Sequence, residues 1–330
     1  MSGKVAIVLA TYNGARFLAE QIESLQAQDV ADWRLFVRDD GSVDPTEAIL
    51  QAAATKDARI TVLPGGERLG VVGNFDALLR HARQWGASYV FPCDQDDVWL
   101  PRKMSKELSL MRALEQLHGS TTPLLVHSDM TVVDDALRPV HPSFLEFQGI
   151  RHVEEDPIRV LLVQNFVTGC ASLYNGALLD FALPMPRGSA VHDWWFAQCA
   201  AARGQIGFVP EVTVQYRQHA ANQIGAAGAW RSLNPFRAQG RRQLVRVWTE
   251  ASRAVAQAGA LRDRMMEHAA RPDPWMELVS EFADLAQVSL RARIATLRKH
   301  GIHRLHRLSP VALLAQLILL DLGSRLAPEA

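Results

Sequence analysis

Strand and helix signals alternate through the first 130 residues, and this pattern constrains the fold more than any other feature. Continuous apolar runs predict strands at residues 4–10, 33–40, 59–64, 88–94 and 123–130, with helical spacing between them. Apolar runs of this kind are typical of strands buried on both faces of a parallel sheet. Such strands are joined by right-handed crossovers, with helices on both faces of the sheet. We therefore predict an α/β fold with a mostly parallel sheet flanked by helices.

Polar clusters follow three of these strands. They read TYNG at residues 11–14, DDGS at residues 39–42 and CDQDD at residues 93–97. Ligands of parallel α/β sheets bind beyond the carboxyl ends of the strands. We therefore expect the three clusters to share one site. No GxGxxG follows the first strand, so a dinucleotide-binding site is unsupported.

The composition is that of a folded protein without a net charge. The chain has 330 residues, of which 48% are hydrophobic, and its 35 Lys and Arg balance 35 Asp and Glu. This length predicts one large domain with an appendage, or two domains. Cys93, Cys170 and Cys199 lie far apart without zinc-type spacing, which is typical of a reducing compartment. With no signal peptide or membrane-length apolar run recognised, we expect a cytoplasmic protein.

The second half of the sequence is less regular. Helices are expected at residues 156–165 and 192–202, strands at 169–175 and, as two short pieces, at 207–219, and a loop around 139–149. From about residue 221 the pattern indicates helices without strands.

This last region carries long basic stretches. No acid occurs at residues 212–249 or 291–320, whereas arginines are frequent there. Such helices suit an anionic membrane surface, or they are simply solvated faces. Aromatic residues are sparse among the arginines, so we expect no nucleic-acid partner. We favour peripheral contact with the inner face of the cell membrane.

Three carboxylates, Asp94, Asp96 and Asp97, end a buried strand and raise the question of what balances their charge. Like charges so close repel, and burying them is costly without a positive partner. Carboxylates at i and i+2 on an extended chain point to the same side. Oxygen ligands in this arrangement suit Mg²⁺ or Mn²⁺. The alternative is a solvated acidic turn, and we favour the metal site.

Several motifs together resemble one known family. They are VLATYNGARFLAEQIESLQAQ, DDGSVDPT, LGVVGNFDALL, DQDDVW and HDWW, and they occur in the family's order over about residues 4–225. They resemble glycosyltransferase family 2, which has the GT-A fold. DQDDVW and YRQHAANQIG are most similar to its bacterial rhamnosyltransferase-like members. The resemblance implies a catalytic domain over residues 1–225, followed by a basic α-helical region over residues 226–330.

The resemblance also implies a nucleotide site. Thr11, Tyr12 and Asn13 would line the base and ribose, and Asp94 would reach the ribose or the metal. Asp39 and Asp40 would include the carboxylate that accepts a hydrogen bond from the pyrimidine N3–H, with Asp40 favoured. The alternative for DDGS is a turn made of good turn residues.

The remaining roles concern the metal, the base and the sugars. The resemblance implies Asp96 and His219 as metal ligands for Mn²⁺ or Mg²⁺, with Arg217 an alternative partner for phosphate. It implies Asp193 as the catalytic base, whereas the alternative is an ordinary acid at a helix N-terminus. Four further residues would contact the donor sugar or the acceptor: Asp97, Gly169, Trp194 and Trp195. For Gly169 the alternative is close packing, and one of the two tryptophans is expected to belong to the core.

These roles describe an inverting, metal-dependent glycosyltransferase. The expected donor is dTDP-rhamnose first and a UDP-hexose second, and the expected acceptor is a cell-surface glycan or a lipid-linked sugar. The sequence lacks QxxRW, which processive relatives carry, so addition of one or a few sugars is expected. Two alternatives remain: a nucleotidyltransferase, and an inactive protein that binds sugar nucleotides.

Overall fold

The protein is described by a computed structural model, which covers residues 3–219, 240–268 and 273–305, together with residues 313, 317, 318 and 320. Its centre is a nine-stranded sheet in the order β3-β2-β1-β4-β8-β6-β9-β5, with β7 paired to β6. The strands are β1 (Val5–Thr11), β2 (Arg34–Asp39), β3 (Ile60–Val62), β4 (Tyr89–Cys93), β5 (Val98–Trp99), β6 (Leu124–Val133), β7 (Pro139–His141), β8 (Ser172–Asn175) and β9 (Gln205–Arg217).

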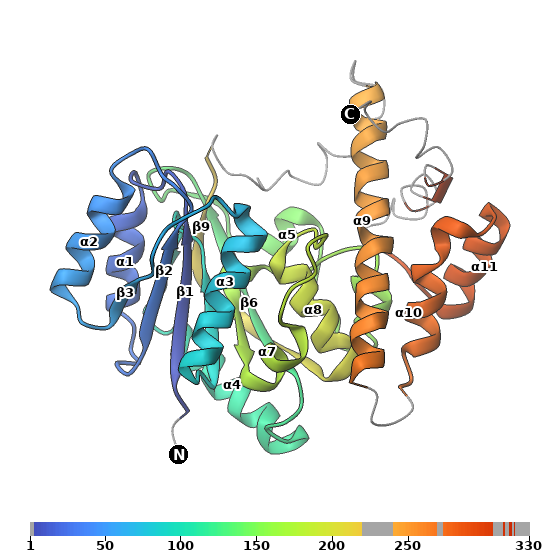
Figure 1. Ribbon diagram of the computed structural model, residues 1–330, viewed down its shortest axis with the longest axis horizontal. Coiled ribbons are helices and arrows are strands. Elements are labelled where there is room, and N and C mark those ends of the chain that lie inside the picture. The colour runs from blue at the N-terminus through green and yellow to red at the C-terminus, as the bar shows by residue number, and fades with distance from the viewer. Residues whose placement is uncertain are drawn as a thin grey trace.

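Helices cover both faces of this sheet (Figure 1). They are α1 (Leu18–Gln26), α2 (Thr46–Lys56), α3 (Gly70–Trp85), α4 (Lys103–His118), α5 (Phe144–Gln148), α6 (Ile158–Leu161), α7 (Gly176–Ala182), α8 (His192–Arg203), α9 (Gly240–Glu267), α10 (Met276–Ala283) and α11 (Leu290–His300), with short 3₁₀ turns η1 (Gly169–Ala171) and η2 (Leu285–Gln287). Along β1, Ile7 and Leu9 pack with α1 and α4, whereas Ala6 and Val8 pack with α3. Successive side chains of a strand point to opposite faces, so a strand buried on both faces must be apolar throughout. The predicted α/β fold is confirmed.

The sheet departs from a simple parallel order at β8. Strands β1 to β4, β6 and β9 run in one direction, because β8 is antiparallel to both β4 and β6. The short strand β5 and the strand β7 were not expected, and β7 and α5 occupy the predicted loop at residues 139–149. The two strands expected at residues 207–219 are one strand, β9, whose pairing with β6 skips Pro210 and Glu211. Proline has no N–H to donate to the ladder, which explains the interruption.

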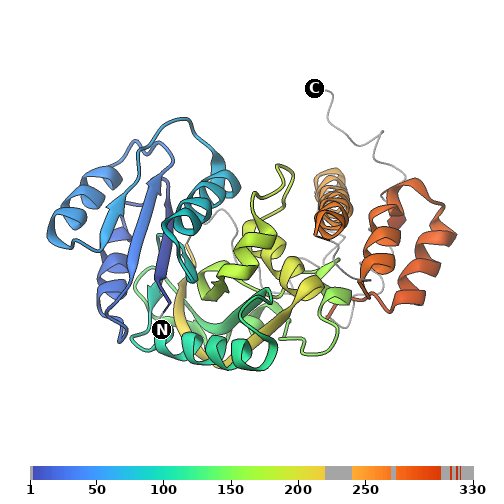
Figure 2. The same cartoon turned by 60° about the horizontal axis from the view of Figure 1, so that its bottom comes forward.

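The described C-terminal helices pack onto the N-terminal part of the chain. Helix α9 lies beside α8, with α10 and α11 on its outer side, as Figures 1 and 2 both show. Ala258 and Leu261 of α9 are fully buried in the same core cluster as Trp195 of α8. Arg264 donates hydrogen bonds to the carbonyls of Phe181 and Leu183, at 2.7 and 2.9 Å. The predicted boundary at residues 225 and 226 lies outside the described residues.

Part of the basic charge in this region is neutralised internally. Arg293 is 1% exposed and donates to the Leu285 and Leu317 carbonyls. Lys299 pairs with Glu277 and Glu281, and His300 contacts Glu281. Arg231, Arg237 and Arg307 lie outside the described residues. No helix in the part of the chain that the structure describes is long and apolar enough to cross a membrane.

Candidate active site

The three polar loops meet at one edge of the sheet, as the parallel arrangement predicts. The Thr11 hydroxyl donates to Asp39 at 2.9 Å, which joins the ends of β1 and β2. The Tyr12 N–H donates to the Gln95 side chain at 2.9 Å, and Gln95 donates back to the Tyr12 carbonyl at 3.1 Å. The loops after β1, β2 and β4 are therefore held together by direct hydrogen bonds, and Thr11 is buried among them.

Asp39 holds the turn that follows β2. One carboxylate oxygen accepts from the hydroxyls of Thr11 and Ser42, at 2.9 and 2.6 Å. The other accepts from the N–H groups of Gly41 and Ser42, at 3.2 and 2.7 Å. A carboxylate oxygen accepts about two hydrogen bonds, so both oxygens of Asp39 are occupied within the protein.

Asp40 is only 4% exposed and anchors the start of α3. Its Oδ1 accepts from Arg38 at 2.9 Å and from the Leu69 N–H at 2.7 Å. Its Oδ2 accepts from the Gly70 N–H at 2.8 Å and has room for one further donor. Of the two neighbouring carboxylates, Asp40 is the one with an open acceptor position.

A stacked pair beside this turn was missed by the sequence reasoning. The Arg68 guanidinium lies over the Tyr12 ring, 4.0 Å from its centroid, and both side chains are at least partly exposed. Asn13 is also exposed, and its side chain accepts from the Val43 N–H at 2.9 Å. The flat faces of Tyr12 and Arg68 form a platform that suits a nucleobase. Arg68 lies in a loop, where no periodic pattern points to it.

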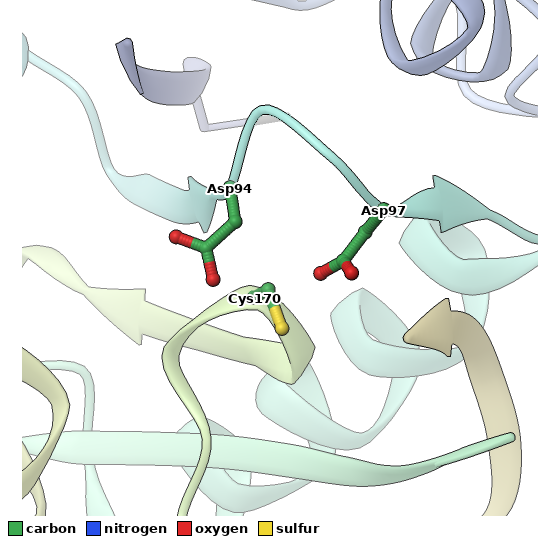
Figure 3. A group of neighbouring side chains, drawn as sticks. All are labelled: Asp94, Asp97 and Cys170. Atoms are coloured by element: carbon green, nitrogen blue, oxygen red, sulfur yellow. The ribbon is translucent and has the colours of Figure 1, made fainter. Parts of the chain in front are cut away.

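The acidic loop, residues 94–97, turns its carboxylates in different directions. Asp94 and Asp97 both point toward Cys170 of η1, as Figure 3 shows. Asp96 instead contacts His219, with 2.9 Å between its Oδ2 and Nε2 of the histidine. Asp97 is 0% exposed and so is not part of a solvated acidic turn, whereas Asp94 and Asp96 are partly exposed. The prediction that Asp97 faces the sugar or acceptor also fails, because its Oδ1 accepts from the buried Arg217 N–H at 3.0 Å.

Burial and mutual repulsion disfavour the ionised forms of Asp94 and Asp97. Burial, then the charges of Asp96 and Asp193, raise the pKa of Asp94 to about 7. Burial, followed by the charges of Asp96 and Asp94, raises the pKa of Asp97 well above its usual range. The site therefore attracts either protons or a cation.

Arg217 does not supply the missing charge to the carboxylates. Its side chain is 1% exposed and donates to the backbone carbonyls of Asp96 and Asp135, at 2.8 and 2.5 Å. The same guanidinium pairs with Glu20 and lies over the Phe17 ring. Arg217 thus holds the backbone of the acidic loop through a buried guanidinium. A buried guanidinium with these partners does not suit the alternative role of pairing with a phosphate.

Asp96 and His219 fit a divalent cation. Neighbouring ligands of an octahedral Mn²⁺ or Mg²⁺ ion with bonds of about 2.1 Å lie about 3 Å apart. The Asp96 oxygen and the His219 nitrogen are 2.9 Å apart as a hydrogen-bonded pair, and an ion bound by both would take the place of the proton they share. Both side chains are partly exposed at the loop edge, so an ion can reach them from solvent.

Asp193 lies in the first turn of α8 and is held from two sides. Its Oδ2 accepts from the Gly169 N–H at 3.0 Å, and its Oδ1 accepts from the Asn165 side chain at 3.1 Å. Burial raises the pKa of Asp193 to about 6. Gly169, which donates to Asp193, precedes Cys170, and the ligand atoms of Cys170 and Asp94 lie within 4.8 Å of each other, so both carboxylates face the turn η1. Asn165 is a site residue that the sequence reasoning missed, because its role depends on a contact across 28 residues.

Gly169 is required for close packing. A Cβ at this position would lie 2.4 Å from the His192 ring nitrogen, where no side chain fits. Its N–H donates to Asp193, so Gly169 positions this carboxylate, and contact of this backbone with the donor sugar stays a prediction. His192 stacks on Phe75, and burial lowers the pKa of His192 to about 3.

The two tryptophans of HDWW have different surroundings. Trp195 is 0% exposed, and its indole N–H donates to the Ala182 carbonyl at 2.9 Å. It belongs to the core, so the prediction that it contacts a sugar is wrong. Trp194 is partly exposed, and its indole N–H donates to the Leu161 carbonyl at 2.5 Å. Only Trp194 of the pair has a surface that a ligand can reach.

Comparison with protein families identifies the N-terminal part of the chain. Residues 6–122 match the family described as glycosyl transferase family 2. The dTDP-rhamnosyl transferase RfbG of Shigella flexneri is 25% identical over 66% of this chain and 74% of its own length. The putative glycosyltransferase EpsE of Bacillus subtilis is 29% identical over 42% of this chain. The match spans half of EpsE, at 50% of its length.

Solved structures with the GT-A fold resemble the whole architecture. A mannosyltransferase of Pyrobaculum calidifontis in complex with GDP-Man and Mn²⁺ has a TM-score of 0.54 at 16% identity, over 98% of this chain and 88% of that chain. The Staphylococcus aureus TarS fragment 1–349 in complex with UDP-GlcNAc has a TM-score of 0.53 at 17% identity, over 98% and 91% of the two chains. At these identities the likeness concerns the fold.

Proposed function

Because the chain belongs to glycosyltransferase family 2 and has the GT-A fold, we propose that it transfers a sugar from a nucleoside diphosphate sugar to an acceptor hydroxyl. One observation carries this proposal. A carboxylate with a raised pKa, Asp193, is held by the Gly169 N–H of η1, the turn whose Cys170 lies against Asp94 and Asp97 of the acidic loop. A base and a metal-binding site side by side are what a displacement at a sugar diphosphate requires.

The donor nucleotide would lie on the platform of Tyr12 and Arg68. The open acceptor position on Asp40 Oδ2 suits the N3–H of a thymine or uracil. We favour dTDP-rhamnose because the relative named as a dTDP-rhamnosyl transferase matches 66% of the chain. A UDP-hexose is second, because a relative from Escherichia coli named as a UDP-Glc-using glucosyltransferase is 29% identical over 32% of the chain.

Asp96 and His219 would hold the divalent cation, with Asp94 as a further carboxylate nearby. When bound, Mn²⁺ or Mg²⁺ neutralises charge on the diphosphate that departs from the sugar. The hydrogen bond between Asp96 and His219 holds the two side chains together, and both would become ligands once the shared proton is lost. Arg217 supports them by holding the Asp96 carbonyl at 2.8 Å.

Asp193 would act as the base. It takes the proton from the acceptor hydroxyl while that oxygen attacks the anomeric carbon from the face opposite the leaving diphosphate, so the configuration inverts. A pKa of about 6 leaves the carboxylate mostly ionised at neutral pH and still basic enough to accept a proton. The hydrogen bonds from Gly169 and Asn165 fix its orientation, and the partly exposed Trp194 offers a flat face to a sugar.

The acceptor would be a cell-surface glycan or a lipid-linked sugar, reached from the inner face of the cell membrane. The exposed arginines Arg291 and Arg298 of α11 support such contact. Each cation near an anionic surface contributes about 1 kcal/mol. Because Lys299 and His300 pair with acids, this contact is weaker than the basic sequence alone implies.

The test is release of nucleoside diphosphate from a panel of dTDP-, UDP- and GDP-sugars with Mn²⁺, compared between the wild type and Asp96→Asn. We expect metal-dependent release from a thymidine or uridine donor that the variant lacks. Pyrophosphate release from a nucleoside triphosphate would instead indicate a nucleotidyltransferase. Tight binding of a sugar nucleotide without any turnover across acceptor extracts would indicate an inactive binding protein.

A further inference from the structure

We propose that Asp94, Asp97 and Cys170 form a second, buried cation site that takes a thiophilic divalent ion such as Zn²⁺. The ligand atoms of these three side chains all lie within 4.8 Å of one another. Figure 3 shows both carboxylates, from the loop between β4 and β5, converging on the Cys170 thiol. This site goes beyond the proposed function, in which Asp96 and His219 would hold the reaction's cation, and it takes Asp94 as a ligand of the second ion instead.

The first argument is the missing positive charge. Within residues 3–219, neither Asp94 nor Asp97 takes part in an ion pair. The nearby cations have other partners: Lys103 pairs with Glu107 at 2.6 Å, and the Arg217 guanidinium contacts backbone carbonyls and an acid of α1. Buried carboxylates are retained in proteins when they are paired or coordinate a metal.

The second argument is an orphaned ligand atom. Asp97 is 0% exposed and its Oδ1 accepts from the Arg217 N–H, whereas its Oδ2 is buried without a strong donor, the Cys170 thiol being a weak one. An unsatisfied buried acceptor costs about 1–3 kcal/mol, and more when it is charged. Figure 3 shows this carboxylate directed at Cys170, so a cation placed between them would satisfy it.

The third argument is the chemistry of the donor set. Mg²⁺ and Ca²⁺ take oxygen ligands, whereas Zn²⁺ accepts thiolate together with carboxylate. With bonds of about 2.3 Å to sulfur and 2.0–2.2 Å to oxygen, the three ligand atoms would lie about 3.3–3.7 Å apart. The ligand atoms now lie within 4.8 Å of one another, so the distances between them need to shorten only slightly for all three to bind one ion. Cys170 gives up its proton on binding, as a coordinating thiol does.

The positions of these three side chains also show how an ion would enter the site and what it would change. Asp94 is partly exposed, so the ion has a route from solvent and a water can complete its coordination. A cation here would tie the acidic loop to η1, the turn whose Gly169 N–H holds Asp193. It would also remove the repulsion that Asp96 feels from Asp94 and Asp97.

The experiment uses Co²⁺ as a spectroscopic probe for Zn²⁺ on the full chain, after removal of bound metal with EDTA. A cobalt–thiolate bond gives a near-ultraviolet charge-transfer band. We expect this band in the wild type, displaced by Zn²⁺, and its loss in Cys170→Ser. The matched controls Cys93→Ser and Cys199→Ser, which change equally buried cysteines, keep the band, and so does Asp96→Asn.

X-ray absorption of the Zn²⁺-loaded wild type gives a second readout that needs no variant, with a sulfur neighbour expected at about 2.3 Å. The proposal is overturned if the wild type gives no thiolate band and no sulfur neighbour, or if the band persists in Cys170→Ser. Mn²⁺-dependent turnover without any thiolate signal would reject this site and leave the proposed function intact. A thiolate signal in a protein that binds no sugar nucleotide would support this site and reject the proposed function.

Discussion

Replacing Asp193 by Asn tests the assignment of the base. The amide keeps the size of the side chain, and its oxygen can still accept from Gly169 or Asn165, but it cannot take a proton. Base catalysis contributes about 10²–10⁴-fold, or roughly 3–5 kcal/mol of barrier at 1.36 kcal/mol per tenfold. We expect the transfer rate to fall by this factor, while the affinity for the donor changes little because Asp193 does not contact the nucleotide loops.

The pH dependence adds a second signature. Burial raises the pKa of Asp193 to about 6, and the ionised form is the active one. The rate should therefore fall as the pH drops through 6, to about one tenth at pH 5. The folding stability has the opposite sign. A folded pKa of about 6 against 3.8 means that this group stabilises the fold most below pH 3.8. That stability is lost as the pH rises through 6, about 3 kcal/mol in all.

The assay measures the rate of sugar transfer from the amount of product formed, over pH 5–8. The affinity for the donor is measured separately by titration. The part of the acid limb that belongs to Asp193 should be present in the wild type and absent from Asp193→Asn, whereas titration of Asp94, with its pKa of about 7, is common to both. Asp193→Glu is the matched control that retains a carboxylate and a titrating limb at lower rate. A variant Asp193→Asn with near wild-type transfer, or with an unchanged acid limb, would refute the role of Asp193.

Three further changes test other parts of the site. Asp40→Asn should weaken dTDP or UDP binding about 10–100-fold, because a hydrogen bond to a charged acceptor is worth about 1.5–3 kcal/mol; equal loss for ATP would contradict base recognition. His219→Asn should lower the affinity for Mn²⁺, measured by titration, by more than about 100-fold. Loss of a residue that only supports a metal ligand costs about 10–100-fold, and loss of the ligand itself should cost more. An unchanged affinity would remove His219 from the metal site. Leu261→Ala, a fully buried position of α9, should destabilise the fold by about 2–5 kcal/mol in denaturant without changing nucleotide affinity; no destabilisation would show that α9 does not share the core.

The part of the fold that local patterns encode was predictable. Residues 5–10 and Tyr89–Cys93 are apolar throughout because both faces of these strands are buried, and this indicates a parallel sheet. The placement of β8 between β4 and β6 was not predictable, because an antiparallel strand inserted from residue 172 leaves no mark on its neighbours. The two strands expected around Pro210 reflect a real interruption of the hydrogen-bond ladder. The pairing of β9 with β6 continues on both sides of it, so the chain forms one strand.

The site divides in the same way. The meeting of the loops after β1, β2 and β4 follows from the strand directions, so Thr11 and Asp39 could be placed together from the sequence. The direction of each acidic side chain could not. Asp96 faces His219 and Asp97 faces the interior, although the two are adjacent in the chain. Trp194 and Trp195 likewise share a motif, but only one reaches the surface, because consecutive helical residues point about 100° apart.

The most direct test of the account is metal-dependent recognition of a pyrimidine nucleotide. We would measure the unfolding midpoint with dTDP, UDP, GDP, CDP or ATP, each in Mn²⁺ or in EDTA, and compare each with the same metal condition without nucleotide. A ligand at 100 times its dissociation constant stabilises the fold by about 2.7 kcal/mol. The account predicts such a rise with dTDP or UDP that EDTA removes. If no nucleoside diphosphate raises the midpoint in Mn²⁺, the edge formed by Tyr12, Asp40 and Asp96 is not a donor site.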